Sequence, residues 1–281
     1  KIYNSMQCAI IRFKKFDKIP INCDSIYLTT LYSPFNRIIA LSMQRKKIII
    51  NSFDHGSGIG NTSNWMNADI EYQLTNNFIT FGKDFIPILN EFNMRRKVLL
   101  NSDFKIIPSY LLNKNNIANN RNLKIKNIIY LTTMTFSPDT HCLPDPLGIS
   151  TYTIFKINIL KSLSKLKKYN LYIKEHPETK KENCIHKDIL KSLDIIQTKK
   201  YLEDLKESSN LFIIDYIQTS CLRFALENKI KTILFINNET DTSREIIKQL
   251  KKYNFIEIIN IVNTQIPIDP KLINNKIKKL N

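Results

Sequence analysis

The second half of the chain alternates short apolar runs with amphipathic stretches, and this alternation constrains the fold more than any other feature. The apolar runs are NIIYLTTM, LYIKEH, DIIQT, LFIID, TILFIN and FIEIINIV. Continuous apolar strands that alternate with helices are typical of a parallel sheet covered on both faces. The second half is therefore predicted to be an α/β domain.

The stretches between these runs place apolar residues at helical spacing. The longest, Thr151–Tyr169, is expected to bury the side that carries Ile154, Ile157, Leu160 and Leu163. Shorter helices are expected in IHKDILKSL, YLEDLKESSN, SCLRFALENK, SREIIKQLKKYN and DPKLINNKIKKLN.

The first half contains four further apolar runs, SIYLTTLY, KKIIINSF, NFITFG and KVLLNS, and these read as short buried strands. A polar stretch, Asn113–Asn127, has the composition of a linker. We therefore predict two Rossmann-like parallel-sheet domains, residues 1–122 and 123–281, which face a cleft at the carboxyl ends of their strands. The chain begins at Lys1 without a methionine, and the first domain is expected to be incomplete at its N-terminus.

The formal net charge of the chain is +17 at pH 7, and two explanations of it stay open. Lysine, asparagine and isoleucine are abundant throughout, so the charge can reflect genome composition. It can also serve an anionic partner such as a nucleotide, a phosphorylated lipid or a membrane surface. The sequence has no zinc-finger spacing, no RNP-like strand and no compact arginine cluster, which argues against a nucleic-acid partner.

Cysteine usage and hydropathy indicate the compartment. The five cysteines are odd in number and form no CxxC motif, which argues against a disulfide framework and against structural zinc. The sequence contains no run of about 18 uncharged apolar residues, so it predicts no transmembrane helix. We therefore expect a cytoplasmic protein, with peripheral contact at the inner face of the cell membrane as its form of membrane association.

The segment NSFDHGSGIG concentrates glycine in a chain that has only five glycines. Gly56, Gly58 and Gly60 follow an expected strand, together with Asp54 and His55. Glycines there allow the backbone to approach a ligand closely, and their N–H groups can cradle a phosphate. The segment matches neither the P-loop nor the GxGxxG pattern. A plain glycine turn beside an exposed histidine is the alternative.

Two further segments place polar side chains at the ends of expected strands. In YIKEHPE, Lys174 and His176 share one face of the strand, and Pro177 ends it. In LFIIDYIQTS, a strand runs into Asp215. Simpler structural explanations stay open for both segments, namely a histidine that is merely satisfied at a strand end and a hydroxyl that caps a helix.

The helix expected after LFIIDYIQTS begins with two hydroxyl side chains. Thr219 and Ser220 open this helix, where free N–H groups and the positive end of the dipole favour an anion. Arg223 and Glu227 are one turn apart, so they can pair on the helix surface.

These motifs together resemble a family of surface-carbohydrate biosynthesis transferases with the GT-B fold. The resemblance is carried by KEHP, by IIDYIQTS before a helix, by ENKIKTILF, and in the first half by DHGSGIG and FITFG. More distantly, the chain is similar to CDP-glycerol glycerophosphotransferases and to capsule Kdo and sialic-acid transferases. The resemblance covers Asn51–Phe81 and Tyr172–Asn237. Many GT-B enzymes carry an acid that holds the donor ribose where Arg223 stands here, and this departure puts ribose binding in doubt.

The resemblance implies a metal-independent glycosyltransferase without a cofactor, which moves a sugar or polyol phosphate from a nucleotide-activated donor to a lipid-linked or surface glycan, such as lipopolysaccharide or capsule. His55 would be the general base, oriented by Asp54. The donor phosphates would lie against residues of the second domain. These are Lys174, His176, Asp215, Thr219 and Ser220, of which His176 also stabilises charge as the bond breaks.

Two alternatives stay open beside the transferase. One is a nucleotide-sugar epimerase of the same fold, which would need carboxylates beside the sugar. The other is a catalytically inactive scaffold subunit of a glycan-assembly complex, which the arginine at position 223 favours.

Overall fold

The chain divides into two compact units, Lys1–Lys114 and Asn115–Asn281. This division falls at the start of the polar stretch that was expected to be a linker, and each unit is considered by itself. The computed structural model describes residues 2–29, 31, 33–54, 71–80, 86, 90, 105–108, 124–132, 148–177, 179, 184–207, 209–217, 219–237 and 244–281. The assignment of an acceptor side and a donor side to the two halves stays a prediction.

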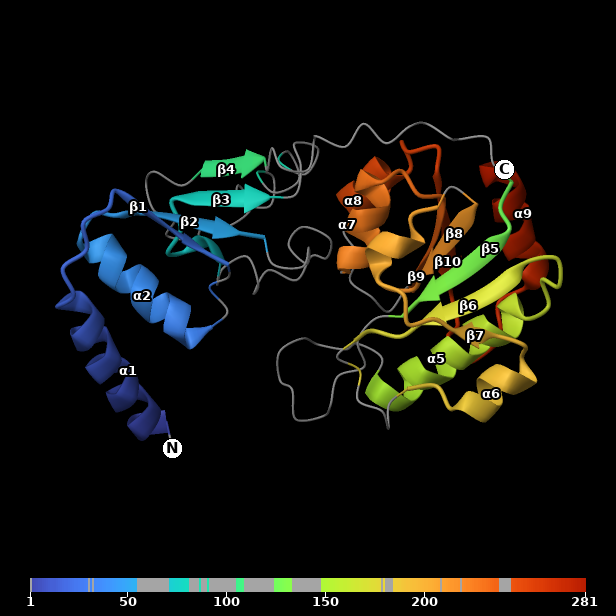
Figure 1. Ribbon diagram of the computed structural model, residues 1–281, viewed down its shortest axis with the longest axis horizontal. Coiled ribbons are helices and arrows are strands. Elements are labelled where there is room, and N and C mark those ends of the chain that lie inside the picture. The colour runs from blue at the N-terminus through green and yellow to red at the C-terminus, as the bar shows by residue number, and fades with distance from the viewer. Residues whose placement is uncertain are drawn as a thin grey trace. The chain divides into compact units, whose positions relative to one another are not determined.

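Among its described residues, the first unit contains a parallel four-stranded sheet, of order β1-β2-β3-β4, and the helices α1 and α2 (Figure 1). The elements are α1 (Ile2–Asp17), β1 (Ser25–Leu28), α2 (Pro34–Arg45), β2 (Ile49–Phe53), β3 (Asn77–Thr80) and β4 (Lys105–Pro108). The first three strands lie within the predicted runs. The run predicted at Lys97–Ser102 lies outside the described residues, and β4 follows it in the chain.

Helices α1 and α2 were not predicted from the sequence. Helix α2 has a recognisable start, because Ser33 precedes it and Pro34 occupies its first turn. Its buried residues Ala40 and Met43 pack against Ile48, just before β2, and Ile50, within β2. This contact holds α2 against the sheet.

The second unit is the α/β domain that the alternating pattern predicts. Its elements are β5 (Asn127–Leu131), α5 (Gly148–Leu163), β6 (Asn170–Lys174), α6 (Lys187–Ser192), β7 (Ile196–Gln197), the 3₁₀ helix η4 (Leu202–Leu205), β8 (Asn210–Ile214), α7 (Ser220–Glu227), β9 (Thr232–Asn237), α8 (Arg244–Leu250), β10 (Ile256–Ile261) and α9 (Pro270–Leu280). The six strands are parallel and lie in the order β10-β9-β8-β5-β6-β7.

This order starts from the middle of the sheet. The chain moves outward from β5 to β7, and then returns to place β8 on the other side of β5. Right-handed crossovers therefore leave α5 and α6 on one face and α7 and α8 on the other, as Figure 1 shows. The direction of winding reverses between β5 and β8, and open α/β sheets bind ligands beside the carboxyl ends of such strands.

The helix α5 begins at Gly148, before the predicted segment Thr151–Tyr169, and ends inside that segment at Leu163. Of the residues expected on its buried side, Leu160 and Leu163 are buried and Ile157 packs against the core, whereas Ile154 is 41% exposed. Phe155, Ile159 and the side chain of Lys156 are buried as well. Apolar residues occur on several sides of this helix, so spacing alone identified only part of its buried face. The sheet and α9 select it, since Phe155 and Ile159 join the same core as Ile273 of α9.

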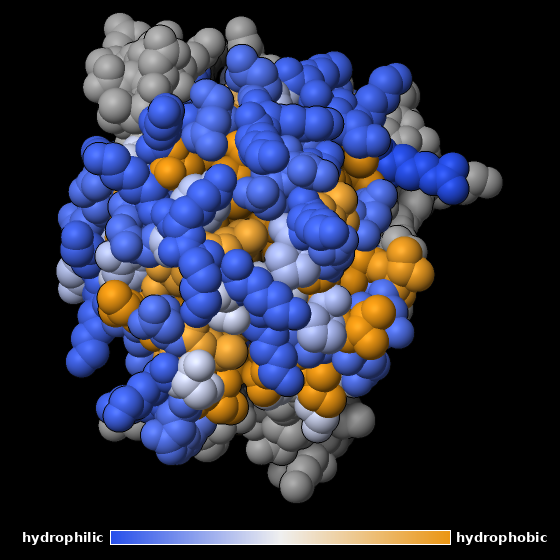
Figure 2. Space-filling model, turned by 90° about the vertical axis from the view of Figure 1, so that its right-hand side faces the viewer, coloured by the Kyte–Doolittle hydropathy of each residue, from blue (hydrophilic) through white to orange (hydrophobic). Residues whose placement is uncertain are grey.

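The part of the chain that the structure describes contains no helix with both the length and the apolar character that crossing a bilayer requires. Figure 2 shows one face of the molecule, which is covered mainly by hydrophilic residues with smaller hydrophobic groups between them.

Candidate functional site

The carboxyl end of β6 separates its side chains onto the two faces of the sheet. Ile173 is fully buried in the core under α5, and Glu175, two residues further, contacts Lys156 of α5. Because successive side chains alternate, Lys174 lies on the opposite face, which α7 covers. The sequence predicted that Lys174 and His176 share one face of this strand, but β6 ends at Lys174, so His176 lies beyond the strand.

The amino end of α7 lies within electrostatic reach of Lys174. Burial raises the pKa of the Cys221 thiol, while the Thr219 hydroxyl and the positive charge of Lys174 lower it. Thr219 is the N-cap of α7, and its Oγ1 accepts a hydrogen bond of 3.2 Å from the backbone N–H of Cys221. Ser220, the first residue of the helix, is exposed. This end of the helix therefore combines two hydroxyl groups with the positive pole of the helix dipole, and the charge of Lys174, on the same face of the sheet, acts on it.

His176 begins a tight turn directly after the strand. Its carbonyl oxygen accepts a hydrogen bond of 3.0 Å from the backbone N–H of Thr179, and Pro177 lies inside the turn. The sequence predicted a turn fixed by Pro177, although β6 itself ends two residues earlier, at Lys174. His176 is partly exposed, so its imidazole is accessible to solvent.

Asp215 follows β8, but its carboxylate is not placed like a phosphate contact. It is 5% exposed, and it accepts hydrogen bonds from the hydroxyl groups of Tyr130 and Tyr152, the second at 2.6 Å. Tyr152 belongs to α5, so this carboxylate faces the helix opposite to α7. This arrangement favours a role for Asp215 in holding the end of β8 in place, and it does not favour the predicted contact with the donor phosphate.

Burial has a large effect on both partners in this contact. It raises the pKa of Asp215, against the smaller lowering effects of the two tyrosine hydrogen bonds and of Lys156. The pKa of Tyr130 is also well above its usual range, because the phenol is buried and lies beside Asp215. Both shifts have the same origin, since burial penalises a charge on either group.

A buried ion pair lies next to these residues and was missed by the sequence analysis. Lys156 Nζ is 3.9 Å from Glu175 Oε2 and 5.2 Å from the centre of the Tyr152 ring. Thr132, which follows β5, donates a hydrogen bond of 3.1 Å to the same carboxylate oxygen. A lysine inside the apolar run TIFKINIL was the available signal, since buried lysines almost always have a partner.

In the first unit, the described part of the predicted glycine-loop site is limited to Asp54. This residue follows β2, is 5% exposed, and its backbone N–H donates a hydrogen bond of 2.9 Å to the carbonyl oxygen of Ile79. His55, Gly56, Gly58 and Gly60 lie outside the described residues. Their predicted roles therefore stay predictions.

Arg223 occupies the buried side of α7 and not its surface. It is 3% exposed, so the expected surface pair with Glu227 is wrong in its location. The two residues do interact, because Arg223 lowers the pKa of Glu227 against the larger raising effect of burial. Arg223 therefore adds a second cation to the helix that carries Thr219.

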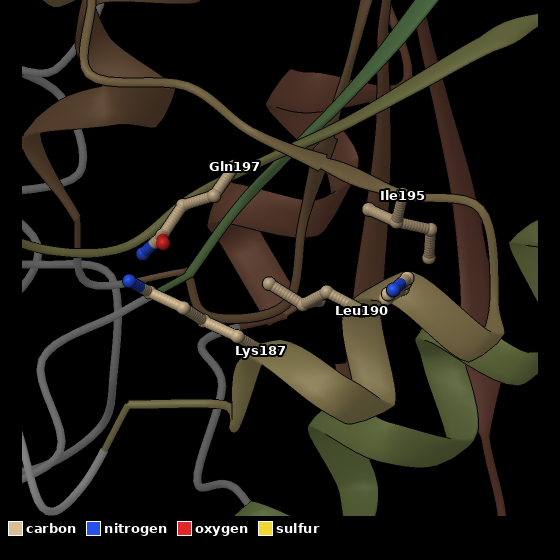
Figure 3. Close-up of a pocket in the computed structure, with 5 residues that line it drawn as sticks. Lys187, Leu190, Ile195 and Gln197 are labelled. Carbon is tan, nitrogen blue, oxygen red and sulfur yellow. The ribbon is translucent and has the colours of Figure 1, made fainter.

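A separate hollow of about 350 Å³ lies between α6 and β7. Leu190 and Ile195 line it together with Lys187, Lys191 and Gln197. Figure 3 shows the side chains of Lys187 and Gln197 pointing toward one another. None of the predicted site residues lines this hollow, so it does not coincide with the group at the end of α7.

Comparison with known proteins adds a family and a fold. Residues 12–252 match the model of the LIC12162 family transferase. The structure is similar to that of S. aureus MnaA with UDP, at a TM-score of 0.51 and 9% identity over 98% of this chain and 72% of that one. It is also similar to the "putative UDP-N-acetylglucosamine 2-epimerase" of Listeria monocytogenes, at a TM-score of 0.51 and 11% identity over 97% and 70% of the two chains.

A search of curated protein sequences finds no significant match. At these identities the two solved structures establish the fold alone. The two parallel-sheet units are GT-B-like, as the sequence motifs predicted.

Proposed function

Because the chain belongs to the LIC12162 family of transferases, we propose that it transfers a sugar or polyol phosphate from a nucleotide-activated donor to a surface or lipid-linked glycan. The observation that carries this proposal is the group formed by Lys174, Thr219 and Ser220 at the amino end of α7. It lies beside the strands where the winding of the sheet reverses, which is where folds of this kind bind nucleotides.

The chemistry of this group suits a diphosphate leaving group. Lys174 supplies a full positive charge, and the N–H groups at the start of α7 supply partial ones. The Thr219 hydroxyl accepts a hydrogen bond within the cap, yet its own proton can still be donated to a phosphate oxygen. Fixed donors and cations of this kind stabilise the charge that develops as the bond to the phosphate breaks.

The remaining roles come from the motifs. His55 is proposed as the general base on the acceptor hydroxyl, since an imidazole titrates near neutral pH. His176 is proposed to stabilise the departing phosphate. No metal takes part in this scheme, because Lys174, His176 and the helix dipole supply the positive charge.

A nucleotide-sugar epimerase is the second candidate, and it is favoured by the similarity to one structure that carries that description. This reaction would use the same phosphate contacts but would release a rearranged sugar instead of an extended glycan. Incubation with UDP-, CDP- and GDP-sugars, with and without a glycan acceptor, separates the two when the acceptor is analysed by mass spectrometry and the donor sugar by NMR, since epimers have the same mass. Extension of the acceptor supports the transferase, whereas consumption of the donor that does not depend on the acceptor supports the epimerase.

A lipid-linked acceptor would bring the protein to an anionic membrane surface. The segments Lys161–Lys168 and Lys248–Lys252 carry the lysines proposed to supply this attraction, at about 1 kcal/mol per residue near the surface. Cosedimentation with vesicles containing phosphatidylserine should show binding at low salt that is lost at high salt. Absence of binding at low salt would leave genome composition as the source of the charge.

A further inference from the structure

We propose that Glu175 is a positioning residue, whose buried contacts turn Lys174 toward the amino end of α7. Glu175 immediately follows β6, and its side chain is 7% exposed. None of the roles assigned above uses it. The inference rests on the proposed function only for the identity of the ligand that Lys174 meets.

The carboxylate of Glu175 is bound by three separate segments of the second unit. Thr132, after β5, donates to Oε2 at 3.1 Å, and the backbone N–H of Ile185, before α6, donates to Oε1 at 2.9 Å. Lys156 of α5 contributes the ion pair at 3.9 Å. These contacts fix both carboxylate oxygens on the α5 face of the sheet.

The contacts act where the strand pairing ends. Lys174 is the last residue of β6 in register with β5, paired with Leu131. One more backbone hydrogen bond follows, from Thr132 N–H to the Lys174 carbonyl oxygen at 3.1 Å. Beyond this hydrogen bond, the chain is held by the side-chain contacts of Glu175 instead of by backbone pairing. Because adjacent side chains alternate, a Glu175 held on the α5 face sets Lys174 on the α7 face.

Glu175 is the ion-pair partner of the buried Lys156. The side chain of Lys156 is fully buried, and an unpaired buried cation is strongly unfavourable. Burial raises the pKa of Asp215, the other acid nearby, and so favours its neutral form. Glu175 is the residue that forms an ion pair with Lys156, at 3.9 Å between Nζ and Oε2, and its hydrogen bonds orient its carboxylate.

The test separates the hydrogen bonds of Glu175 from its charge. In a Lys156→Met background, the cation is absent, so Glu175→Gln and Glu175→Ala can be compared without leaving a lone buried lysine. Glutamine can still accept from Ile185 and donate to Thr132, whereas alanine can do neither. Lys174→Met in the same background reports the loss of the positioned cation itself.

The first readout needs no ligand. The pKa of the Cys221 thiol, measured from the pH dependence of its alkylation in a variant without the other four cysteines, reports whether Lys174 lies beside α7. We expect Glu175→Ala and Lys174→Met to raise this pKa equally, and Glu175→Gln to leave it unchanged. An unchanged pKa in Glu175→Ala or in Lys174→Met, or an equal rise in Glu175→Gln, would overturn the inference.

The second readout is affinity for UDP, CDP and GDP by calorimetry. Loss of a charge-assisted contact predicts binding that is weaker by about 10- to 100-fold in Glu175→Ala, with Glu175→Gln close to its parent. Combining Glu175→Ala with Lys174→Met should weaken binding no further than Lys174→Met alone, since both act through one side chain. Additive losses would contradict the inference. If the wild-type protein binds no nucleotide, the proposed function fails, while the thiol readout still decides the role of Glu175.

Discussion

The hydroxyl group of Tyr152 donates a hydrogen bond of 2.6 Å to Asp215 Oδ2, and this contact joins the first half of α5 to the end of β8. Tyr130, from β5, donates to the same oxygen. The carboxyl group of Asp215 thus joins β5 and β8, the two strands between which the winding of the sheet reverses. The carboxylate of Asp215 faces α5, whereas the residues proposed to bind the donor lie on the opposite face of the sheet.

The raised pKa of Asp215 predicts how the stability of the fold depends on pH. The folded state holds this proton more tightly than the unfolded chain, whose value is near 3.8. The resulting contribution to the free energy of unfolding is fully present below that value and is lost as the pH rises through the raised folded-state pKa. Asp215→Asn should flatten this dependence in urea titrations taken at several pH values. A dependence equal to that of the wild type would contradict the assignment.

Removal of the α7 cap should weaken both the fold and the binding of nucleotides. The double variant Thr219→Ala/Ser220→Ala loses the capping hydroxyl, which typically costs about 1 kcal/mol of stability. It also loses the hydroxyl donors proposed for the phosphate. Asp269→Ala is a matched control, because Asp269 caps α9 with a hydrogen bond of 2.9 Å to the N–H of Lys271.

Thermal unfolding with and without UDP, CDP or GDP measures both effects. The two variants should lose similar stability, but only Thr219→Ala/Ser220→Ala should lose protection by nucleotide. Full protection of that double variant would remove the anion site from this end of the helix.

The role proposed for His55 predicts a selective loss of turnover. His55→Ala should reduce the rate of transfer by about 100- to 10,000-fold, as is usual for a missing general base, and leave nucleotide affinity nearly intact. His186→Ala is the control, since His186 caps α6 at an exposed position. Wild-type turnover in His55→Ala would exclude the base role. A folded variant that no longer binds nucleotide would move His55 to the phosphates.

The sequence was sufficient to predict the architecture of the second unit, because its strands are continuous apolar runs and its helices have a clear period. It also predicted that Lys174 lies at the end of a strand with His176 close behind it, and that Thr219 caps a helix. The alternation of side chains along a strand and the preference of threonine for the N-cap depend only on neighbouring residues, so the sequence is enough to predict both.

The buried group under α5 could not be predicted in the same way. Lys156, Glu175 and Asp215 come from three segments that meet only when the strands adopt the order with β5 in the middle. The choice of Phe155 over Ile154 as a buried residue likewise depends on packing against the sheet and α9. In the first unit, α1 and α2 were missed because their sequences interleave apolar with polar and basic residues and contain no long apolar run.

The central claim is that Lys174 and the amino end of α7 bind the phosphates of a nucleotide, and calorimetric titration of the wild type and of Lys174→Met tests it most directly. UDP, CDP and GDP should each be titrated into both proteins, with Lys191→Met, on exposed α6, as the matched control. The account predicts saturable binding of at least one nucleotide to the wild type and to Lys191→Met. It predicts binding weaker by about 10- to 100-fold in Lys174→Met. Equal affinity in all three proteins, or no binding to the wild type, would contradict it.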